Sequence, residues 1–243
     1  MGYKSVFRRY ELKYLLTYEQ KATVLSAMEK HMQLDQYGRT TIRNLYFDDD
    51  SYRLIRRSIE KPDYKEKLRV RSYAEADDQS EVFVELKKKY DGVVYKRRIA
   101  LPYITAMDWL TGRAKSPIDC QICREIDYFK SYYAPLHPSV FLSYEREAYF
   151  ERSGGDFRVT FDDSILARTT ELSLASKPCG KAILPEGRVM MEIKCSGAIP
   201  LWMVEVLSRE KIYKTSFSKY GRAYADHILP ELTNIDKELM LNA

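Results

Sequence analysis

Charged residues recur at every second position in five short stretches of this chain, and this spacing constrains the fold more than any other feature. Because side chains of a β-strand alternate between its two faces, each stretch gives its strand one charged face and one largely apolar face. The pattern therefore predicts a β-sheet with a polyelectrolyte side. The stretches are Glu11-x-Lys13, Lys67-x-Arg69-x-Arg71, Glu85-x-Lys87, Lys96-x-Arg98 and Glu192-x-Lys194.

The same spacing indicates how the strands assemble. If the apolar faces pack against helices, the charged faces turn toward one another and enclose a basic concavity dotted with carboxylates. We expect about eight strands in antiparallel order, with helices inserted between them. The economical architecture is an α+β fold in which an antiparallel β-barrel forms a tunnel with a polar, basic interior and helices packed outside.

Local signals place the individual elements. Thr17 is a suitable N-cap for a helix whose apolar stripe runs to Met32, and Asp91-Gly92 is typical of a two-residue hairpin turn. No repeat or linker interrupts the chain, so residues 1–243 are expected to form one domain. The expected strands span about 6–15, 43–48, 66–73, 81–89, 93–101, 140–150, 157–161 and 189–194, and the expected helices about 17–32, 104–111, 119–133, 201–209 and 217–232.

Composition limits the classes of partner and compartment. The net charge of +5, from 40 basic and 35 acidic residues, is mild for a nucleic-acid-binding protein, so no nucleic-acid partner is expected. No run of about 18 apolar residues occurs, and the N-terminus lacks the apolar core of a secretory signal, so we expect a cytoplasmic protein without a membrane segment. The single Cys-x-x-Cys, Cys120 to Cys123, has no second pair, which favours reduced thiols over a zinc site.

A water-poor interior lined by these basic side chains is not stable without anions, because an unpaired buried charge costs several kcal/mol. Glu11, Glu85 and Glu192 offset only part of the charge, so the pattern predicts bound phosphate, sulfate or abundant water. Guanidinium groups match phosphate oxygens with two hydrogen bonds, and lysine adds a movable point charge. Carboxylates are ligands that Mg²⁺ and Mn²⁺ prefer, together with phosphates of a substrate.

Simpler explanations exist for the single features. One face of an antiparallel sheet commonly faces water, although the faces here are heavily Lys and Arg rather than mixed polar. The run Lys87-Lys88-Lys89 and the 20 tyrosines are the basis for an alternative nucleic-acid surface, but strand alternation sends Lys88 away from its neighbours. Neither a P-loop nor a dinucleotide-binding glycine motif occurs, so nucleotide chemistry here is of another type.

Seven short motifs run in order along nearly the whole chain, from about residue 7 to 228. They are Arg9-Tyr10-Glu11-Leu12-Lys13-Tyr14, Leu45-Tyr46-Phe47-Asp48, Lys67-Leu68-Arg69-Val70-Arg71-Ser72-Tyr73, Val84-Glu85-Leu86-Lys87, Lys96-Arg97-Arg98, Met191-Glu192-Ile193-Lys194 and Phe217-Ser218-Lys219-Tyr220. Together they resemble the VTC-type polyphosphate polymerase domain, the catalytic domain of the vacuolar transporter chaperone complex, which also has stand-alone bacterial relatives. That family belongs to the triphosphate tunnel metalloenzymes, whose antiparallel strands form a tunnel lined with basic residues and acidic metal ligands.

The resemblance implies synthesis of inorganic polyphosphate from ATP, with Mn²⁺ or Mg²⁺ as cofactor. Glu192 matches the main metal ligand of the family, and Glu85 and Glu11 are acidic neighbours expected to assist it. Ser218 and Lys219 are expected to contact substrate, and Arg98 lies at the right parity to do so. The positions that match catalytic, phosphate-binding residues are Lys13, Arg69, Arg71, Lys87, Lys96, Arg146, Arg158 and Lys194.

Two positions depart from the pattern of some relatives. Arg9 stands where hydrolytic and cyclase relatives carry a first Glu, which favours the polymerase branch. Ser216 stands where some relatives carry a further Lys, and Lys214 is the candidate substitute. The rival functions are a tripolyphosphatase or nucleoside triphosphatase at the same site, and a non-catalytic module that binds polyphosphate or nucleic acid.

Overall fold

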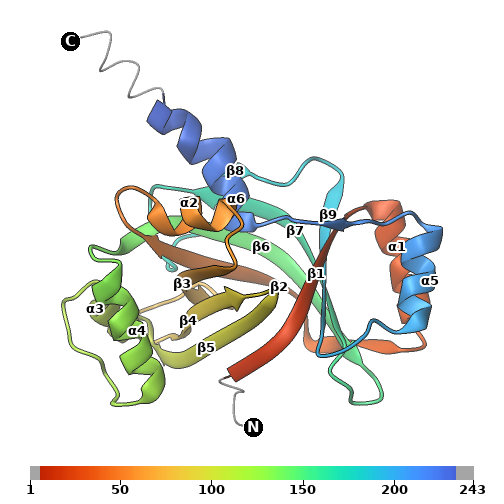
Figure 1. The fold of residues 1–243 in the computed structure, drawn as a ribbon, viewed down its shortest axis with the longest axis horizontal. Coiled ribbons are helices and arrows are strands. Elements are labelled where there is room, and N and C mark those ends of the chain that lie inside the picture. The colour runs from red at the N-terminus through yellow and green to blue at the C-terminus, as the bar shows by residue number, and fades with distance from the viewer. Residues whose placement is uncertain (1–5, 234–243) are drawn as a thin grey trace.

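The computed structural model describes residues 6–233, with side chains from Tyr10 onward, as an α+β fold (Figure 1). Its strands are β1 (Val6–Thr17), β2 (Met32–Asp48), β3 (Tyr64–Ser72), β4 (Glu81–Tyr90), β5 (Val93–Pro102), β6 (His137–Glu151), β7 (Arg158–Arg168), β8 (Lys181–Ala182), β9 (Arg188–Cys195) and β10 (Lys214–Thr215). Its helices are α1 (Tyr18–Met28), α2 (Arg53–Ile59), α3 (Tyr103–Leu110), α4 (Gln121–Tyr132), α5 (Leu201–Arg209), α6 (Lys219–Ala223) and the π-helical turn η1 (Tyr224–Ile228).

Eight of the strands form a ring. Every strand pairing is antiparallel, and the pairings lead from β1 through β5, β4, β3, β2, β6, β7 and β9 back to β1. The contact of β1 with β5 is short and covers only residues 6–9, while residues 10–17 pair with β9. The predicted antiparallel barrel with helices outside is therefore confirmed, with one wall that is joined along only part of its length.

The hairpin between β4 and β5 shows how the sequence sets the register. Asp91 and Gly92 both have positive φ, +44° and +77°, as a two-residue turn of this kind requires. Tyr90 therefore lies opposite Val93, and the pairing continues without a shift to Glu81 and Pro102. This register aligns Lys87 with Lys96, so that the charged positions of the two strands share one face.

Two apolar layers lie outside the ring, on opposite sides in Figure 1. On one side Leu68 and Val70 of β3 pack in a cluster with Trp109 of α3 and Phe129 of α4. On the other side β1, β7 and β9 pack against α1 and α5 in a separate cluster. Because side chains alternate along a strand, the charged residues between these apolar positions turn into the ring.

A third apolar cluster fills one end of the interior. Tyr46 of β2 and Tyr144 of β6 belong to it, together with Tyr220 of α6 and Ile228 of η1. The Tyr220 hydroxyl donates to the buried carboxylate of Asp48 at 2.9 Å, which ties the C-terminal helix to β2. The helix that begins at Lys219 therefore closes this end of the barrel and places its first residues beside the charged interior.

The first helix begins at a capping box. The Thr17 hydroxyl accepts a hydrogen bond from the backbone nitrogen of Gln20 at 3.1 Å, and the Gln20 side chain accepts one from the Thr17 backbone at 3.0 Å. Replacing Thr17 by Ala is expected to lower the free energy of unfolding by about 1 kcal/mol, measured by urea denaturation. Thr23→Ala, at a half-buried position inside the same helix, is the control and should change stability by less; equal losses would contradict the cap.

Several predicted boundaries were wrong. The first helix ends at Met28, and Met32 opens β2, which begins well before the predicted residue 43. Residues 33–41 of β2 are mostly half-buried or exposed, so they lack the apolar alternation that would identify a strand. The predicted C-terminal helix begins at Lys219 and runs to residue 233, with a π-helical turn inside it. The short elements α2, β8 and β10 were not predicted.

Candidate active site

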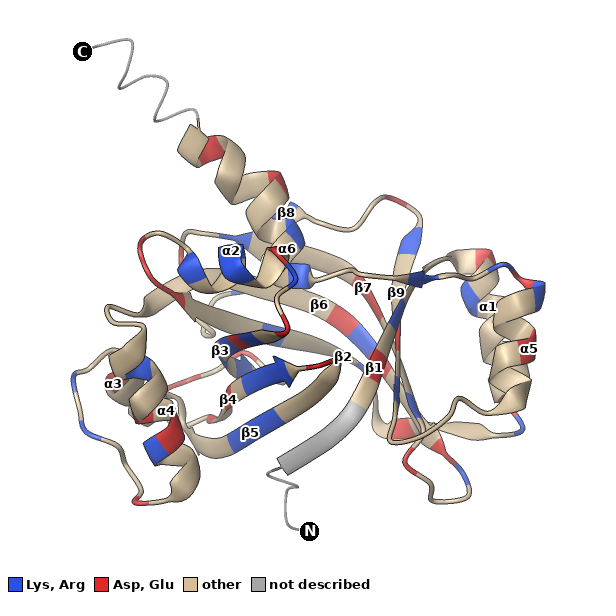
Figure 2. Ribbon diagram, viewed as in Figure 1, with Lys and Arg blue, Asp and Glu red and all other residues tan. Residues whose placement is uncertain are grey.

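The barrel interior holds most of the sequence-predicted site residues. Figure 2 shows basic positions along β3, β4, β5 and β9 and acidic positions among them. The inward side chains link neighbouring strands through ion pairs and hydrogen bonds, which define their common face. The predicted residues that the structure brings together there are Glu11, Lys13, Arg69, Arg71, Glu85, Lys87, Lys96, Arg98, Arg146, Glu192, Lys194, Ser218 and Lys219.

Glu85 is the most enclosed acid of this set and lies among four basic side chains. Its carboxylate is fully buried and lies 2.7 Å from the Nη2 atom of Arg69, 3.1 Å from the Nζ atom of Lys96, 3.4 Å from Arg98 Nε and 4.0 Å from Arg71 Nε. Burial opposes its charge, but these four cations outweigh that effect and hold the pKa of Glu85 well below its usual range. Glu85 therefore stays ionised and fixes the positions of the cations around it.

A second buried carboxylate, Asp162 of β7, organises the opposite wall. Arg146 donates to both of its oxygens, at 2.6 and 2.7 Å, and Lys219 approaches to 2.5 Å. Burial raises the pKa of Asp162, but Arg146 and Lys219 overcome this and lower it. The sequence carried a signal for this residue in the alternation Arg158-x-Thr160-x-Asp162, but its role as a counterion was not predicted.

Glu11 and Glu192 lie on neighbouring strands at the centre of a lysine-rich region. In the register of β1 and β9, Glu11 stands opposite Lys194 and Lys13 opposite Glu192. Lys87 lies 2.5 Å from Glu11, and Lys194 lies 3.3 Å from Glu192. Burial disfavours the charge of Glu192, but Lys194, Lys13 and Lys87 prevail and hold its pKa well below the usual range.

The two carboxylates suit a metal ion that keeps much of its own hydration. Glu11 and Glu192 are close enough to influence each other's pKa, and both are ionised acids facing one space. Mg²⁺ is commonly held by one or two carboxylates together with substrate phosphates. Glu85 does not fit the predicted metal role, because its oxygens are engaged by Arg69, Lys96 and Arg98. Among the described residues, no three His, Cys, Asp or Glu side chains form a metal-holding group.

The hydrogen-bond acceptor of the Lys13 ammonium group is an uncharged backbone carbonyl. Its Nζ atom donates to the backbone carbonyl of Phe217 at 2.9 Å, just before α6. Burial is the main cause that lowers the pKa of Lys13 to about 8, with Glu192 acting in the opposite sense and Lys87 and Lys219 adding to the decrease. The ammonium form of Lys13 is therefore readily available at neutral pH, and an anion beside it would stabilise that form further.

Two predicted residues lie apart from the buried cluster. Arg158, at the start of β7, is exposed and stands opposite Lys194, so it occupies the margin of the interior rather than its centre. Lys214 stands opposite Tyr14, whose side chain belongs to the outer apolar cluster. Because opposite residues of an antiparallel pair share a face, Lys214 points outward, and the hypothesis that it replaces the lysine absent at Ser216 is wrong.

Three polar residues of the interior were not predicted as site residues, namely Asn44, Tyr144 and Lys67. Arg71 donates to the Asn44 side chain at 2.9 Å and to the Tyr144 hydroxyl at 3.1 Å. Burial opposes ionisation of Tyr144, but Arg146 and Arg71 lower its pKa to about 7. Lys67, which precedes Arg69 and Arg71 at the same parity, donates to the Ser218 hydroxyl at 3.0 Å. Strand parity alone identified Lys67 as inward-facing, but not its partner.

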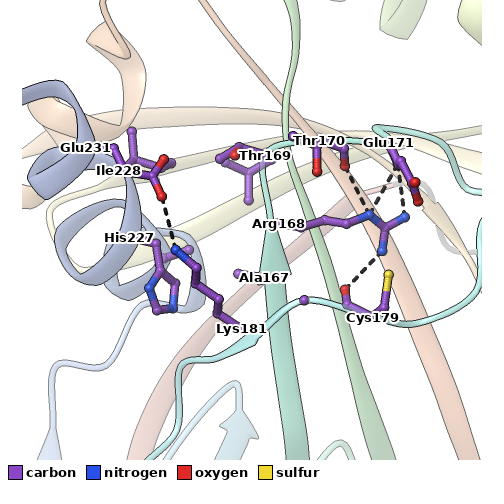
Figure 3. A pocket seen from close by; sticks show the side chains of 13 residues that line it. Ala167, Arg168, Thr169, Thr170, Glu171, Cys179, Lys181, His227, Ile228 and Glu231 are labelled. Atoms are coloured by element: carbon purple, nitrogen blue, oxygen red, sulfur yellow. Dashed lines mark hydrogen bonds and ion pairs between the residues drawn. The ribbon is translucent and has the colours of Figure 1, made fainter. Parts of the chain in front are cut away.

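A cavity of about 450 Å³ lies outside this cluster, between the end of β7 and the C-terminal helix (Figure 3). Arg168 lines it and donates to four backbone carbonyls of the loop 170–179. The Lys181–Glu231 ion pair crosses its rim at 3.0 Å. None of the sequence-predicted site residues lines this cavity.

Comparisons with known proteins agree with this architecture. A proposed adenylate cyclase of Bacillus halodurans shares the fold with a TM-score of 0.56 and 14% identity, over 88% of this chain and 96% of that chain. A proposed adenylyl cyclase of Hippeastrum, described as having a dominant triphosphatase activity, shares the fold with a TM-score of 0.51 and 14% identity. That match covers 90% of this chain and 95% of the other. No curated protein sequence matches this chain. The VTC domain model matches residues 8–227, and the chain therefore belongs to the VTC domain family.

Proposed function

We propose that this protein transfers the terminal phosphoryl group of ATP to a growing chain of inorganic polyphosphate. The observation that carries the proposal is the barrel interior, where basic side chains outnumber four ionised carboxylates, Glu11, Glu85, Asp162 and Glu192. An array of cations inside a ring of strands matches a linear polyanion that carries at least one negative charge per phosphate. Family membership supports the same reading.

In the proposed reaction, an oxygen at the end of the polyphosphate chain attacks the γ-phosphorus of ATP. A new P–O–P bond forms, the bond from the γ-phosphorus to the bridging oxygen breaks, and ADP leaves with that oxygen. Catalysis of this kind depends on alignment and on neutralising charge that shifts toward the bridging oxygen. Arg69 and Arg146 donate hydrogen bonds to the buried carboxylates of Glu85 and Asp162. Arg71 is positioned by its hydrogen bonds to Asn44 and Tyr144, so the three guanidinium groups need little reorganisation.

A divalent ion, Mg²⁺ or Mn²⁺, fits beside Glu11 and Glu192 and would neutralise phosphate oxygens when bound. The lysines around these carboxylates, Lys13, Lys87 and Lys194, supply movable charges on the same side of the interior. Their proximity to the acids keeps the acids ionised, as metal binding requires.

The described residues contain no helix long and apolar enough to cross a membrane.

Product identity tests the proposal. Purified protein is incubated with ATP, MnCl₂ or MgCl₂ and a short phosphate primer, and the products are separated on a gel that resolves polyphosphate. We expect chains that lengthen with time and a matching release of ADP. Free phosphate without polymer would select the triphosphatase alternative, in which water replaces the acceptor. Anion binding with no turnover would select the non-catalytic binding module.

A further inference from the structure

Lys67 occupies a distinctive position in the interior. It lies on β3 at the same parity as Arg69 and Arg71 and stands opposite Lys87 of β4. Its side chain is partly buried, and its Nζ atom donates to the Ser218 hydroxyl at 3.0 Å. Lys13 donates to the carbonyl of Phe217, the residue before Ser218, so the two lysines flank one short segment of the chain.

The partners of Lys67 differ from those of most other inward cations. Arg69, Lys87 and Lys194 each lie within ion-pair distance of a carboxylate. Over residues 10–233, Lys67 forms no such pair, and its hydrogen bond goes to a neutral hydroxyl. Ser218 in turn accepts from the backbone nitrogen of Gly221 at 3.2 Å, so the helix holds the hydroxyl in place.

The charged groups with the largest effects on the pKa of Lys67 are cations. They come from Lys13 on β1, Lys65 and Arg69 on β3, and Lys87 on β4. Burial is the largest cause that lowers the pKa of Lys67, and the repulsion from these cations adds to it, so its pKa lies well below the usual range. An anion placed beside Lys67 would reverse both effects, because it replaces lost solvation and counters the repulsion.

We propose that Lys67 binds a phosphoryl group of the chain substrate and takes up a proton from solvent as that group arrives. The identity of the ligand rests on the proposed function, while the site itself rests on the geometry of β3 and the Ser218 segment. In the absence of substrate, Lys67 has no carboxylate partner over residues 10–233 and is repelled by the neighbouring cations, so a proton on it is poorly stabilised. A phosphate beside Lys67 raises the affinity of its amine for a proton, which couples binding to pH.

Calorimetry with tripolyphosphate tests this inference without requiring turnover. Binding to the wild type, Lys67→Met and Lys67→Arg is measured at one pH in two buffers with different ionisation enthalpies, which reports the protons taken up per binding event. Protons exchanged by tripolyphosphate itself are common to all variants. We expect Lys67→Met to lose a substantial part of the uptake and to bind about tenfold more weakly. Lys67→Arg should keep much of the affinity but lose the same uptake, because arginine stays charged.

Lys88→Met provides the matched control, since Lys88 follows the inward Lys87 and pairs with Glu66 on the outer face. Circular dichroism melts establish that each variant is folded. Equal proton uptake and affinity in the wild type and Lys67→Met would overturn the inference. The test of Lys67 is separate from the test of the function. If the wild type makes polymer but Lys67→Met takes up as many protons as the wild type, only the role of Lys67 is refuted. If proton uptake depends on Lys67 as expected but the wild type makes no polymer, only the polymerase function is refuted.

Discussion

Replacing Lys87 by Met is expected to lower the turnover number for phosphoryl transfer about a hundredfold or more. Lys87 lies on the inner face of β4 beside Glu11, in the region proposed to hold the metal and the phosphates. Removing one fixed charge from an enclosed site that stabilises developing negative charge typically costs factors of this size. Methionine keeps most of the stem, so the expected loss reflects the missing charge. The measurement is steady-state release of ADP from ATP with a phosphate primer.

Lys88→Met is the control for this prediction, because the adjacent residue presents the same side chain on the opposite face. Lys88 lies 3.7 Å from Glu66 and 3.9 Å from Glu125, outside the barrel. Its replacement should leave turnover within about twofold of the wild type, since surface ion pairs contribute little. Equal effects of the two substitutions would contradict the assignment of the inner face as the site of reaction.

Replacing Glu85 by Gln is expected to lower the free energy of unfolding by about 3–5 kcal/mol. The substitution leaves Arg69, Arg71, Lys96 and Arg98 around a neutral amide in a buried place. Tripolyphosphate should restore much of the lost stability, because it supplies the negative charge that the variant lacks. Urea denaturation with and without tripolyphosphate measures both effects. Glu231→Gln removes an exposed carboxylate and should cost less than about 1 kcal/mol.

The pH dependence gives this prediction a definite sign. The pKa of Glu85 in the folded protein is well below its ordinary value of 4.5, so its contribution is complete above that value. It is lost as pH falls toward the lowered pKa, and the wild type should then approach the stability of Glu85→Gln. A stability difference that stays constant down to strongly acidic pH, or a variant as stable as the wild type at pH 7, would contradict the role of Glu85 as the buried counterion.

Much of this architecture could be predicted from strand periodicity. The alternation around Arg69 and Glu85 identified an inner charged face. The apolar residues between the charged ones are buried on the outer face, so the charged side chains must point the other way. The N-terminal part of β2 could not be predicted in this way, since its side chains are partly exposed on both faces and give no period. Its strand conformation comes from pairing with β6, which is a long-range contact.

The sequence predicted which residues line the site better than it predicted which side chains they contact. Parity shows which face a residue occupies, but the partner depends on how distant strands meet. Glu85 therefore looked like a metal ligand until the register placed four cations around it, and Asp162 was overlooked because its partners Arg146 and Lys219 are remote in sequence. The position of Lys67 beside Ser218 likewise depends on where the C-terminal helix closes the barrel.

A crystal structure of the protein with tripolyphosphate tests the central claim most directly, namely that the barrel interior binds a chain of phosphates. We expect the anion inside the ring of strands, with its oxygens within hydrogen-bond distance of Arg69, Arg146 and Lys87. Tripolyphosphate bound only on the outer surface, with these side chains contacting water and their carboxylate partners alone, would contradict the account.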